Sequence, residues 1–146
     1  TANGGVDSSA AQTFTISIDS LPTVTLDASK SVCKGTSSAT YNYVAGTTGI
    51  VSYRIDYNIG AETAGFSDTT RTITSSTSIL IPIPAGVAAG TYSADIYFLN
   101  GNGCSSNAYT ITLNINQPPT AAVISGTASI CPSGSTNLAV NVTNGA

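Results

Sequence analysis

The amino-acid sequence predicts an all-β protein, an antiparallel β-sandwich that recurs in tandem along the chain. Three observations predict this fold: apolar and polar residues alternate along most of the chain, turn-forming residues separate the alternating segments, and one long stretch repeats. The composition agrees with it. The chain has 22 Thr and 20 Ser against 4 Lys and Arg and 7 Asp and Glu, so the polar faces of the strands are built from hydroxyl side chains. Thr is β-branched and suits a pleated, half-buried surface.

The alternation marks the strands. Val51, Tyr53, Ile55 and Tyr57 share one face of the clearest candidate. The predicted strands are Val24–Leu26, Ala39–Val44, Val51–Tyr57, Ile79–Ile83, Tyr92–Phe98 and Tyr109–Ile115. Residues 61–77 fit either a short strand pair or a long loop, and no stretch shows sustained helical spacing. Six or seven strands with one apolar face each predict an immunoglobulin-like sandwich of two sheets.

An internal repeat sets the domain organisation. The stretch Thr13–Pro22 aligns with Thr110–Pro119, an offset of 119 − 22 = 97, which also places Asp7 on Cys104. Ser31-Val-Cys33 matches Ser129-Ile-Cys131 at an offset of 98. We therefore expect residues 1–20 to be the last strand of a preceding repeat, 21–118 a complete repeat, and 119–146 the opening strands of the next.

Charge and hydropathy exclude several classes of function. The net charge is −3 with only four cationic side chains, which argues against a nucleic-acid partner. No apolar run reaches the roughly 18 residues of a membrane span. The chain begins without Met and shows no signal peptide, so we expect it to be an internal segment of a longer protein.

The residues that carry enzymatic chemistry are missing or scattered. The chain has no His, so neither a Ser-His-Asp nor a Cys-His nucleophile system can be assembled. Its three Cys match no zinc-ligand spacing, and its acidic residues form no Asp-x-Asp motif for calcium. We therefore expect no catalytic activity, no metal and no cofactor.

Two aromatic residues are candidates for particular roles. Tyr97 lies on the polar face of its predicted strand and could contact a carbohydrate, or could instead pack under a neighbouring loop. The Gly90-Thr-Tyr92 stretch fits a tyrosine corner, in which the hydroxyl bonds nearby backbone, or an ordinary core aromatic.

Three motifs resemble a known family. Ser31-Val-Cys-Lys-Gly35, Ala89-Gly-Thr-Tyr92 and Asn102-Gly-Cys104 are similar to the PKD-like and immunoglobulin-like repeats of very large Bacteroidota surface proteins, including gliding-motility adhesins exported by the type IX secretion system. The resemblance implies an extracellular, cell-anchored rod of many domains. Asp7 departs from it, because it replaces the Cys of the Asn-Gly-Cys motif in the upstream repeat.

The function that this organisation predicts is a structural spacer and adhesion module. Its partners would be the neighbouring repeats and a surface polysaccharide or another surface protein. One alternative is a carbohydrate-binding module. The other is a pilus-like subunit that donates residues 1–20 to a neighbour. The start of a second repeat at 119–146 argues against this alternative.

The secreted location that the resemblance implies suggests a disulfide between Cys33 and Cys104, with Cys131 unpaired. A strict immunoglobulin topology places the two at opposite ends, beyond the roughly 7 Å limit for a bridge. Either Ser31–Cys33 runs beside the last strand, or each Cys bonds to an adjacent repeat. We predict the bond within the domain.

The resemblance also implies a modification. Bacteroidota that export such repeats O-glycosylate an Asp-Ser or Asp-Thr pair that precedes a small apolar residue or Thr. Asp19-Ser20-Leu21 and Asp68-Thr69-Thr70 fit this pattern, so Ser20 and Thr69 are candidate sites, Thr69 in an expected loop.

Overall fold

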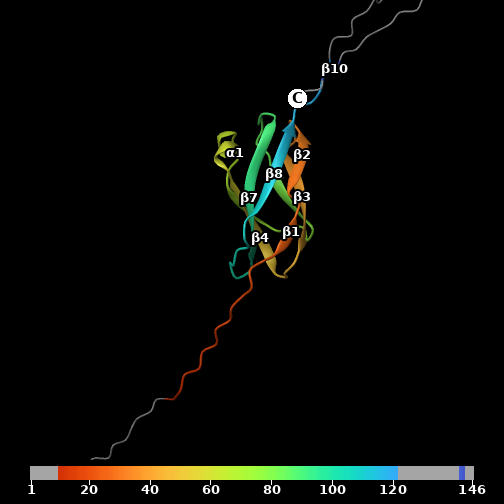
Figure 1. Ribbon diagram of the computed structural model, residues 1–146. Helices are drawn as coiled ribbons and strands as arrows, with labels where there is room; N and C mark the ends of the chain where they lie inside the picture. The colour runs from red at the N-terminus through yellow and green to blue at the C-terminus, as the bar shows by residue number, and fades with distance from the viewer. Residues whose placement is uncertain (1–9, 122–141, 144–146) are drawn as a thin grey trace, which may run out of the picture.

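The computed structural model describes residues 10–121 and 142–143. Within them, strands carry nearly all regular structure, and the one helix is α1 (Ile59–Thr63). The strands are β1 (Val24–Leu26), β2 (Ser29–Cys33), β3 (Ser38–Ala45), β4 (Ile50–Tyr57), β5 (Thr69–Thr72), β6 (Ser78–Pro82), β7 (Gly90–Asn100), β8 (Tyr109–Asn116), β9 (Thr120–Ala121) and β10 (Val142–Thr143). Figure 1 shows β1 to β8 gathered into one body, which the chain enters at one end and leaves at the other.

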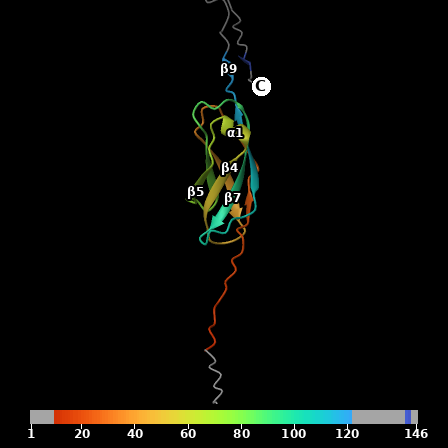
Figure 2. The same cartoon turned by 90° about the vertical axis from the view of Figure 1, so that its left-hand side faces the viewer.

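Strands β1 to β8 form two sheets packed face to face, as Figures 1 and 2 show from two sides. The smaller sheet has the order β1-β3-β6 and the larger β2-β8-β7-β4-β5. Neighbouring strands are antiparallel except for β2, which runs parallel to β8 with Ser29 opposite Thr112 and Cys33 opposite Asn116. The predicted all-β sandwich is thus confirmed, with one parallel pair that the local pattern did not indicate.

The core lies between the sheets and is made by the alternating side chains. Tyr53, Ile55 and Tyr57 of β4 are buried, as their spacing predicted. The largest side chains with almost no exposed surface come from both sheets: Tyr41, Phe98, Ile55, Ile81, Ile96 and Ile111. Because successive residues of a strand point to opposite faces, one buried face per strand suffices to build this core.

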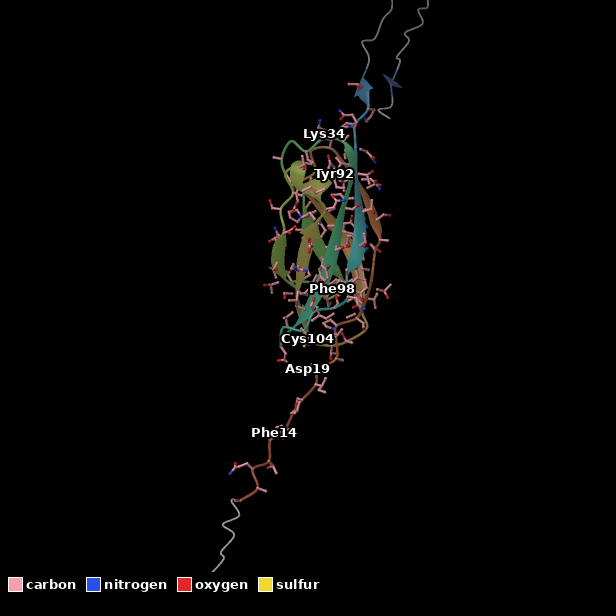
Figure 3. The ribbon with its side chains drawn as sticks, turned by 60° about the vertical axis from the view of Figure 1, so that its left-hand side comes forward. Phe14, Asp19, Lys34, Tyr92, Phe98 and Cys104 are labelled. Atoms are coloured by element: carbon pink, nitrogen blue, oxygen red, sulfur yellow. The ribbon has the colours of Figure 1, made fainter. Side chains whose placement is uncertain are left out.

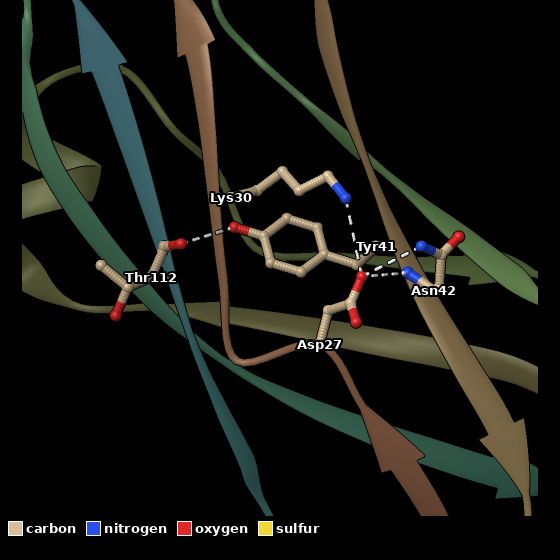
Figure 4. A network of polar contacts seen from close by, with 5 residues as sticks. All are labelled: Asp27, Lys30, Tyr41, Asn42 and Thr112. Atoms are coloured by element: carbon tan, nitrogen blue, oxygen red, sulfur yellow. Dashed lines mark hydrogen bonds and ion pairs between the residues drawn. The ribbon is translucent and has the colours of Figure 1, made fainter.

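Two tyrosine hydroxyls bond across the core from one sheet to the other. Tyr41 on β3 donates to the carbonyl oxygen of Thr112 on β8 at 2.7 Å (Figure 4), and Tyr53 on β4 donates to the carbonyl oxygen of Leu80 on β6 at 2.8 Å. A buried hydroxyl needs such a partner to offset its lost hydration. These bonds hold the two sheets in one relative position.

The chain crosses from the smaller to the larger sheet between β1 and β2, and Asp27 fixes this crossing. Its carboxylate accepts bonds from the backbone N–H and the side-chain amide of Asn42, at 3.0 and 3.1 Å, and lies 3.6 Å from the Lys30 ammonium (Figure 4). The backbone bond from Asn42 is the main cause that holds the pKa of Asp27 below its usual value.

The start of β7 forms the tyrosine corner that was one of the two interpretations of Tyr92. Its hydroxyl donates to the carbonyl oxygen of Ala88 at 3.0 Å. The ring also packs against Phe66, with centroids 5.0 Å apart. Tyr92 therefore fixes the loop before β7 and contributes to the core.

Two local expectations are corrected. Val51 is 45% exposed although it was predicted to share the face of Tyr53, because the pairing of β4 with β7 shifts register between Ile50 and Ser52. Residues 61–77 are neither a strand pair nor a loop throughout, since they hold the end of α1 and the edge strand β5. The helix begins because Asn58 caps it, accepting a bond from the Ala61 N–H at 2.9 Å.

Candidate functional site

The end of the domain where residues 19–22 join it, called here the upstream end, receives the incoming chain in a shallow hollow. The Asp19 carboxylate accepts a bond of 2.6 Å from the side-chain amide of Asn102. Asn102 is itself held, because the Asn100 side chain accepts bonds from the Asn102 and Cys104 N–H groups at 3.1 and 2.9 Å. The hollow, about 440 Å³ in volume, is lined by residues 19–20, 22, 47–49, 51 and 100–102.

Thr23 anchors the incoming chain a few residues further on. Its N–H donates to the Thr47 hydroxyl at 3.1 Å, and its carbonyl oxygen accepts from the Gly46 N–H at 2.8 Å. Gly46 must be glycine for this contact, since a Cβ there would lie 2.6 Å from the Thr23 hydroxyl oxygen. The linker therefore meets the domain through several defined contacts.

The predicted bond between Cys33 and Cys104 is wrong for this structure, in which both are free thiols. Ser31–Cys33 does run beside the last strand, as one alternative required. The pairing is parallel, however, so Cys33 lies opposite Asn116, whereas Cys104 lies in the loop before β8. The eight residues of β8 separate the two ends by roughly 24 Å at about 3.4 Å per residue.

Figure 3 shows the same separation, with Lys34, the neighbour of Cys33, at one end of the domain and Cys104 at the other. Cys104 lies at the upstream end with Asp19, and Cys33 at the opposite end, from which β8 leads out. The alternative in which each Cys bonds to an adjacent repeat is compatible with this placement. Cys131 and Asp7 lie outside the described residues.

The outer face of the larger sheet carries Tyr97, as predicted, on β7 directly opposite Arg54 of β4. The Arg54 guanidinium lies 4.4 Å from the centre of the Tyr97 ring and 3.5 Å from the Asp56 carboxylate. Asp95 lies opposite Asp56 and accepts a bond of 2.7 Å from the Thr110 hydroxyl. Together these five residues form a polar strip across three strands, which we call the Tyr97 strip.

No known protein family matches this chain, and a search of curated proteins finds no significant relative.

The geometry of the Tyr97 strip limits what it can bind. One face of the ring is covered by Arg54, so a sugar could stack only on the other face. A hollow of about 360 Å³ lies beside the strip, lined by Asp56, Asp95 and Thr110 among others. Carboxylates and hydroxyls of this kind bind sugar hydroxyl groups through hydrogen bonds. The strip is therefore a candidate surface for a polar ligand.

The described residues hold no cluster of three or more His, Cys, Asp or Glu side chains placed to bind a metal ion. Over the same residues, no helix has the length and apolar character needed to cross a membrane.

The two candidate glycosylation sites differ in exposure. Ser20 is exposed in the linker. Thr69 is not in a loop as expected, because it opens β5, and its partner in the pairing is the buried Ile55. Paired residues of neighbouring strands point to the same face, so the half-buried Thr69 side chain points toward the core side.

Sequence reasoning missed the contact between Asp19 and Asn102. The Asn100-Gly-Asn-Gly103 stretch has the composition of a turn, but a turn signal does not say which distant residue it will bind. The two residues are 83 positions apart, so only the closed fold brings them together.

Proposed function

We propose that this chain is a spacer and adhesion module from a long extracellular filament of tandem immunoglobulin-like domains. The observation that carries the proposal is the path of the chain, which enters at one end of the sandwich and leaves at the other (Figure 1), with the incoming linker bound by Asn102. A domain joined in this way to neighbours at both ends extends along one axis. Pro22 and the pair Pro118-Pro119 further restrict bending, because proline fixes φ and favours an extended preceding residue.

The strand order supports the immunoglobulin-like type. In such domains the third, sixth and seventh main strands share one sheet, and the second and fifth share the other. If β1 and β2 are counted together as the first strand, the third, sixth and seventh strands are β4, β7 and β8, which lie in the larger sheet. The second and fifth are then β3 and β6, which pair in the smaller sheet. The tyrosine corner at Tyr92 is a further feature of this class.

The pairing of β9 with β10 supports the tandem arrangement. By the repeat offsets, Ala121 corresponds to Val24 on β1 and Val142 to Tyr43 on β3. The two segments pair antiparallel, as β1 and β3 do, with the register displaced by two residues. This pairing is the one expected of the opening of a second domain of the same kind, placed directly after the first.

A location outside the cell is part of the proposal and follows from the family resemblance of the Cys-Lys-Gly, Gly-Thr-Tyr and Asn-Gly-Cys motifs. Of the two glycosylation candidates, the exposed Ser20 is the one we retain. The intact mass of protein purified from its natural source tests it, since a mass equal to that of the bare chain leaves no room for a glycan.

Carbohydrate binding by the Tyr97 strip is a second candidate function, favoured by Arg54 against the Tyr97 ring and by Asp56, Asp95 and Thr110 further along the same strip. A glycan array probed with the chain tests it. Binding that Y97A and R54A both abolish supports a carbohydrate-binding module, whereas absence of binding across the array leaves the spacer function alone.

Small-angle X-ray scattering tests the spacer function. Residues 22–118 are expressed twice in succession, with N116D in the first copy so that the junction carries the Asp19–Asn102 pair. We expect one elongated shape with the length of two domains in line. The matched N116A protein lacks the junction bond and should sample more bent shapes. A compact or broadly flexible shape for the N116D protein contradicts the proposal.

A further inference from the structure

Residues 13–18 form an unpartnered apolar stripe ahead of the domain. Phe14, Ile16 and Ile18 are 83%, 72% and 92% exposed, and Thr13, Thr15 and Ser17 alternate with them. Figure 3 shows Phe14 on an extended segment well away from the sandwich. Period-two alternation is the pattern of a strand that buries one face, yet within the described residues nothing covers this one.

The buried counterparts of these side chains are present in the same structure. The repeat offset of 97 places Phe14, Ile16 and Ile18 on Ile111, Leu113 and Ile115 of β8. Those three are only 2%, 3% and 3% exposed, because β8 packs them against the opposite sheet. The intervening hydroxyl residues correspond to Thr110, Thr112 and Asn114, which lie on the outer face of the same strand.

We infer that residues 13–18 are a docking strand, and that its partner is a domain of this same repeat class that lacks its own last strand. This inference rests on the proposed tandem organisation and names the surface that joins one repeat to the one before it. The strand would lie between the counterparts of β2 and β7, parallel to the first and antiparallel to the second, as β8 does here.

The hydrogen bonds of β8 show which bonds the docked strand would form in its partner. Tyr41 donates to the carbonyl oxygen of Thr112 at 2.7 Å, and the Thr112 N–H donates to the Ala28 carbonyl oxygen at 2.8 Å. Thr15 corresponds to Thr112, so its backbone would receive and donate the same two bonds in the partner. A shift of one residue would turn the apolar side chains outward, which makes this register the favoured one.

Residues 13–18 cannot bury their apolar side chains or pair their backbone on their own domain. The position between β2 and β7 is already filled by β8. The Asp19–Asn102 bond and the Thr23 contacts also hold the linker at the upstream end, from which the stripe points away (Figure 3). A lipid surface is the less suitable occupant, because the regularly spaced polar backbone of a strand requires hydrogen-bond partners.

The experiment pairs two full-length chains. The acceptor carries I111S, L113S and I115S, so its own last strand no longer fits, and also F14S, I16S and I18S, so that one acceptor cannot dock into another. The donor is the unaltered chain. We expect refolding of the mixture to give a one-to-one complex by native mass spectrometry. A donor with F14S, I16S and I18S should bind at least about tenfold more weakly, since its stripe cannot be buried. The matched donor with T13S and S17A, altered only on the outer face, should bind as the unaltered chain does.

A synthetic peptide of residues 109–118 shows whether the acceptor can take up a strand at all. If this peptide completes the acceptor and the donor does not, or if the F14S/I16S/I18S donor binds equally well, the inference is wrong.

If the peptide also does not bind the acceptor, the docking strand is tested at the position of β8 itself. The substitutions I111F, L113I and N114S in the full chain give residues 110–115 the sequence of residues 13–18. Cooperative folding of that variant supports the inference, and loss of the fold overturns it. In the matched control the same six-residue sequence is placed one position further along β8. Its apolar side chains would then point outward, so this variant should not fold. The scattering experiment on joined repeats is independent of all these results, so the spacer proposal and the docking strand can fail separately.

Discussion

The hydroxyl of Tyr41 on β3 donates a hydrogen bond of 2.7 Å to the carbonyl oxygen of Thr112 on β8, and so joins the two sheets near the crossing that Asp27 holds (Figure 4). Thr112 belongs to the last strand of the domain and corresponds to Thr15 in the segment that precedes it. The same bond thus contributes to the stability of the sandwich and to the register that we infer for the docking strand.

The first prediction concerns this bond. Y41F should lower the free energy of unfolding by about 1 kcal/mol, because it removes a hydrogen bond that joins the two sheets. Tyr57 is the matched control, since its buried hydroxyl has no hydrogen-bond partner among the described residues. Y57F should therefore leave stability unchanged or raise it slightly. Urea denaturation of the three proteins measures both, and an equal loss for the two variants contradicts the prediction.

The second prediction concerns alkaline pH. Burial raises the pKa of Tyr41, Tyr43, Tyr53 and Tyr57 above the ordinary value of 10.0. Above pH 10 the unfolded chain therefore releases protons that the folded chain retains, so stability is fully present below that pH and is lost as the pH rises. Denaturation midpoints from pH 8 to pH 12 should fall from about pH 10 upward. A flat profile argues against buried, neutral tyrosines.

The third prediction concerns acid. The pKa of Asp27 is lowered in the folded chain, so the stabilisation from its bonds to Asn42 is fully present above the unfolded value of 3.8 and is lost as the pH falls through the lower folded value. D27N should lose this part of the pH dependence. Comparison of thermal midpoints at pH 2 to pH 6 checks it, and identical slopes for the two proteins refute it.

The fourth prediction concerns the cysteines. Because Cys33 and Cys104 lie at opposite ends of β8, a reducing agent should not change the melting temperature of the monomer. A bond closing their loop of about 71 residues would instead contribute roughly 4 kcal/mol in the chain-entropy model. Melting curves with and without reductant distinguish the two cases. Peptide mapping that found Cys33 joined to Cys104 would show the placement to be wrong.

The fifth prediction concerns the anchor of the incoming chain. G46A should destabilise the domain by about 1–3 kcal/mol, because its Cβ would lie 2.6 Å from the Thr23 hydroxyl oxygen and 3.2 Å from the Thr23 carbonyl oxygen. The control G101A has no atom nearer than 4.0 Å to its new Cβ and should be neutral. Thermal denaturation of both compares them directly.

The sequence by itself determined the class of the fold and the position of most strands. The predicted Val24–Leu26 is β1 without change, and the predicted Tyr109–Ile115 falls within β8 one residue short of its end. Alternation of apolar and polar residues is local information, since each strand buries one face whatever strand lies beside it. For the same reason, the sequence placed Tyr97 on the outer face before its neighbours were known.

Only the tertiary structure decided which strands are neighbours and what that pairing brings together. Nothing in Ser29–Cys33 indicates that it pairs parallel with β8, yet this direction separates Cys33 from Cys104. The exposure of Val51 depends on a register shift against β7, and the Asp19–Asn102 bond joins residues far apart in the chain. Strand order, direction and register depend on contacts between distant segments. The alternation of apolar and polar residues along a strand does not distinguish between these arrangements, because it is the same in each of them.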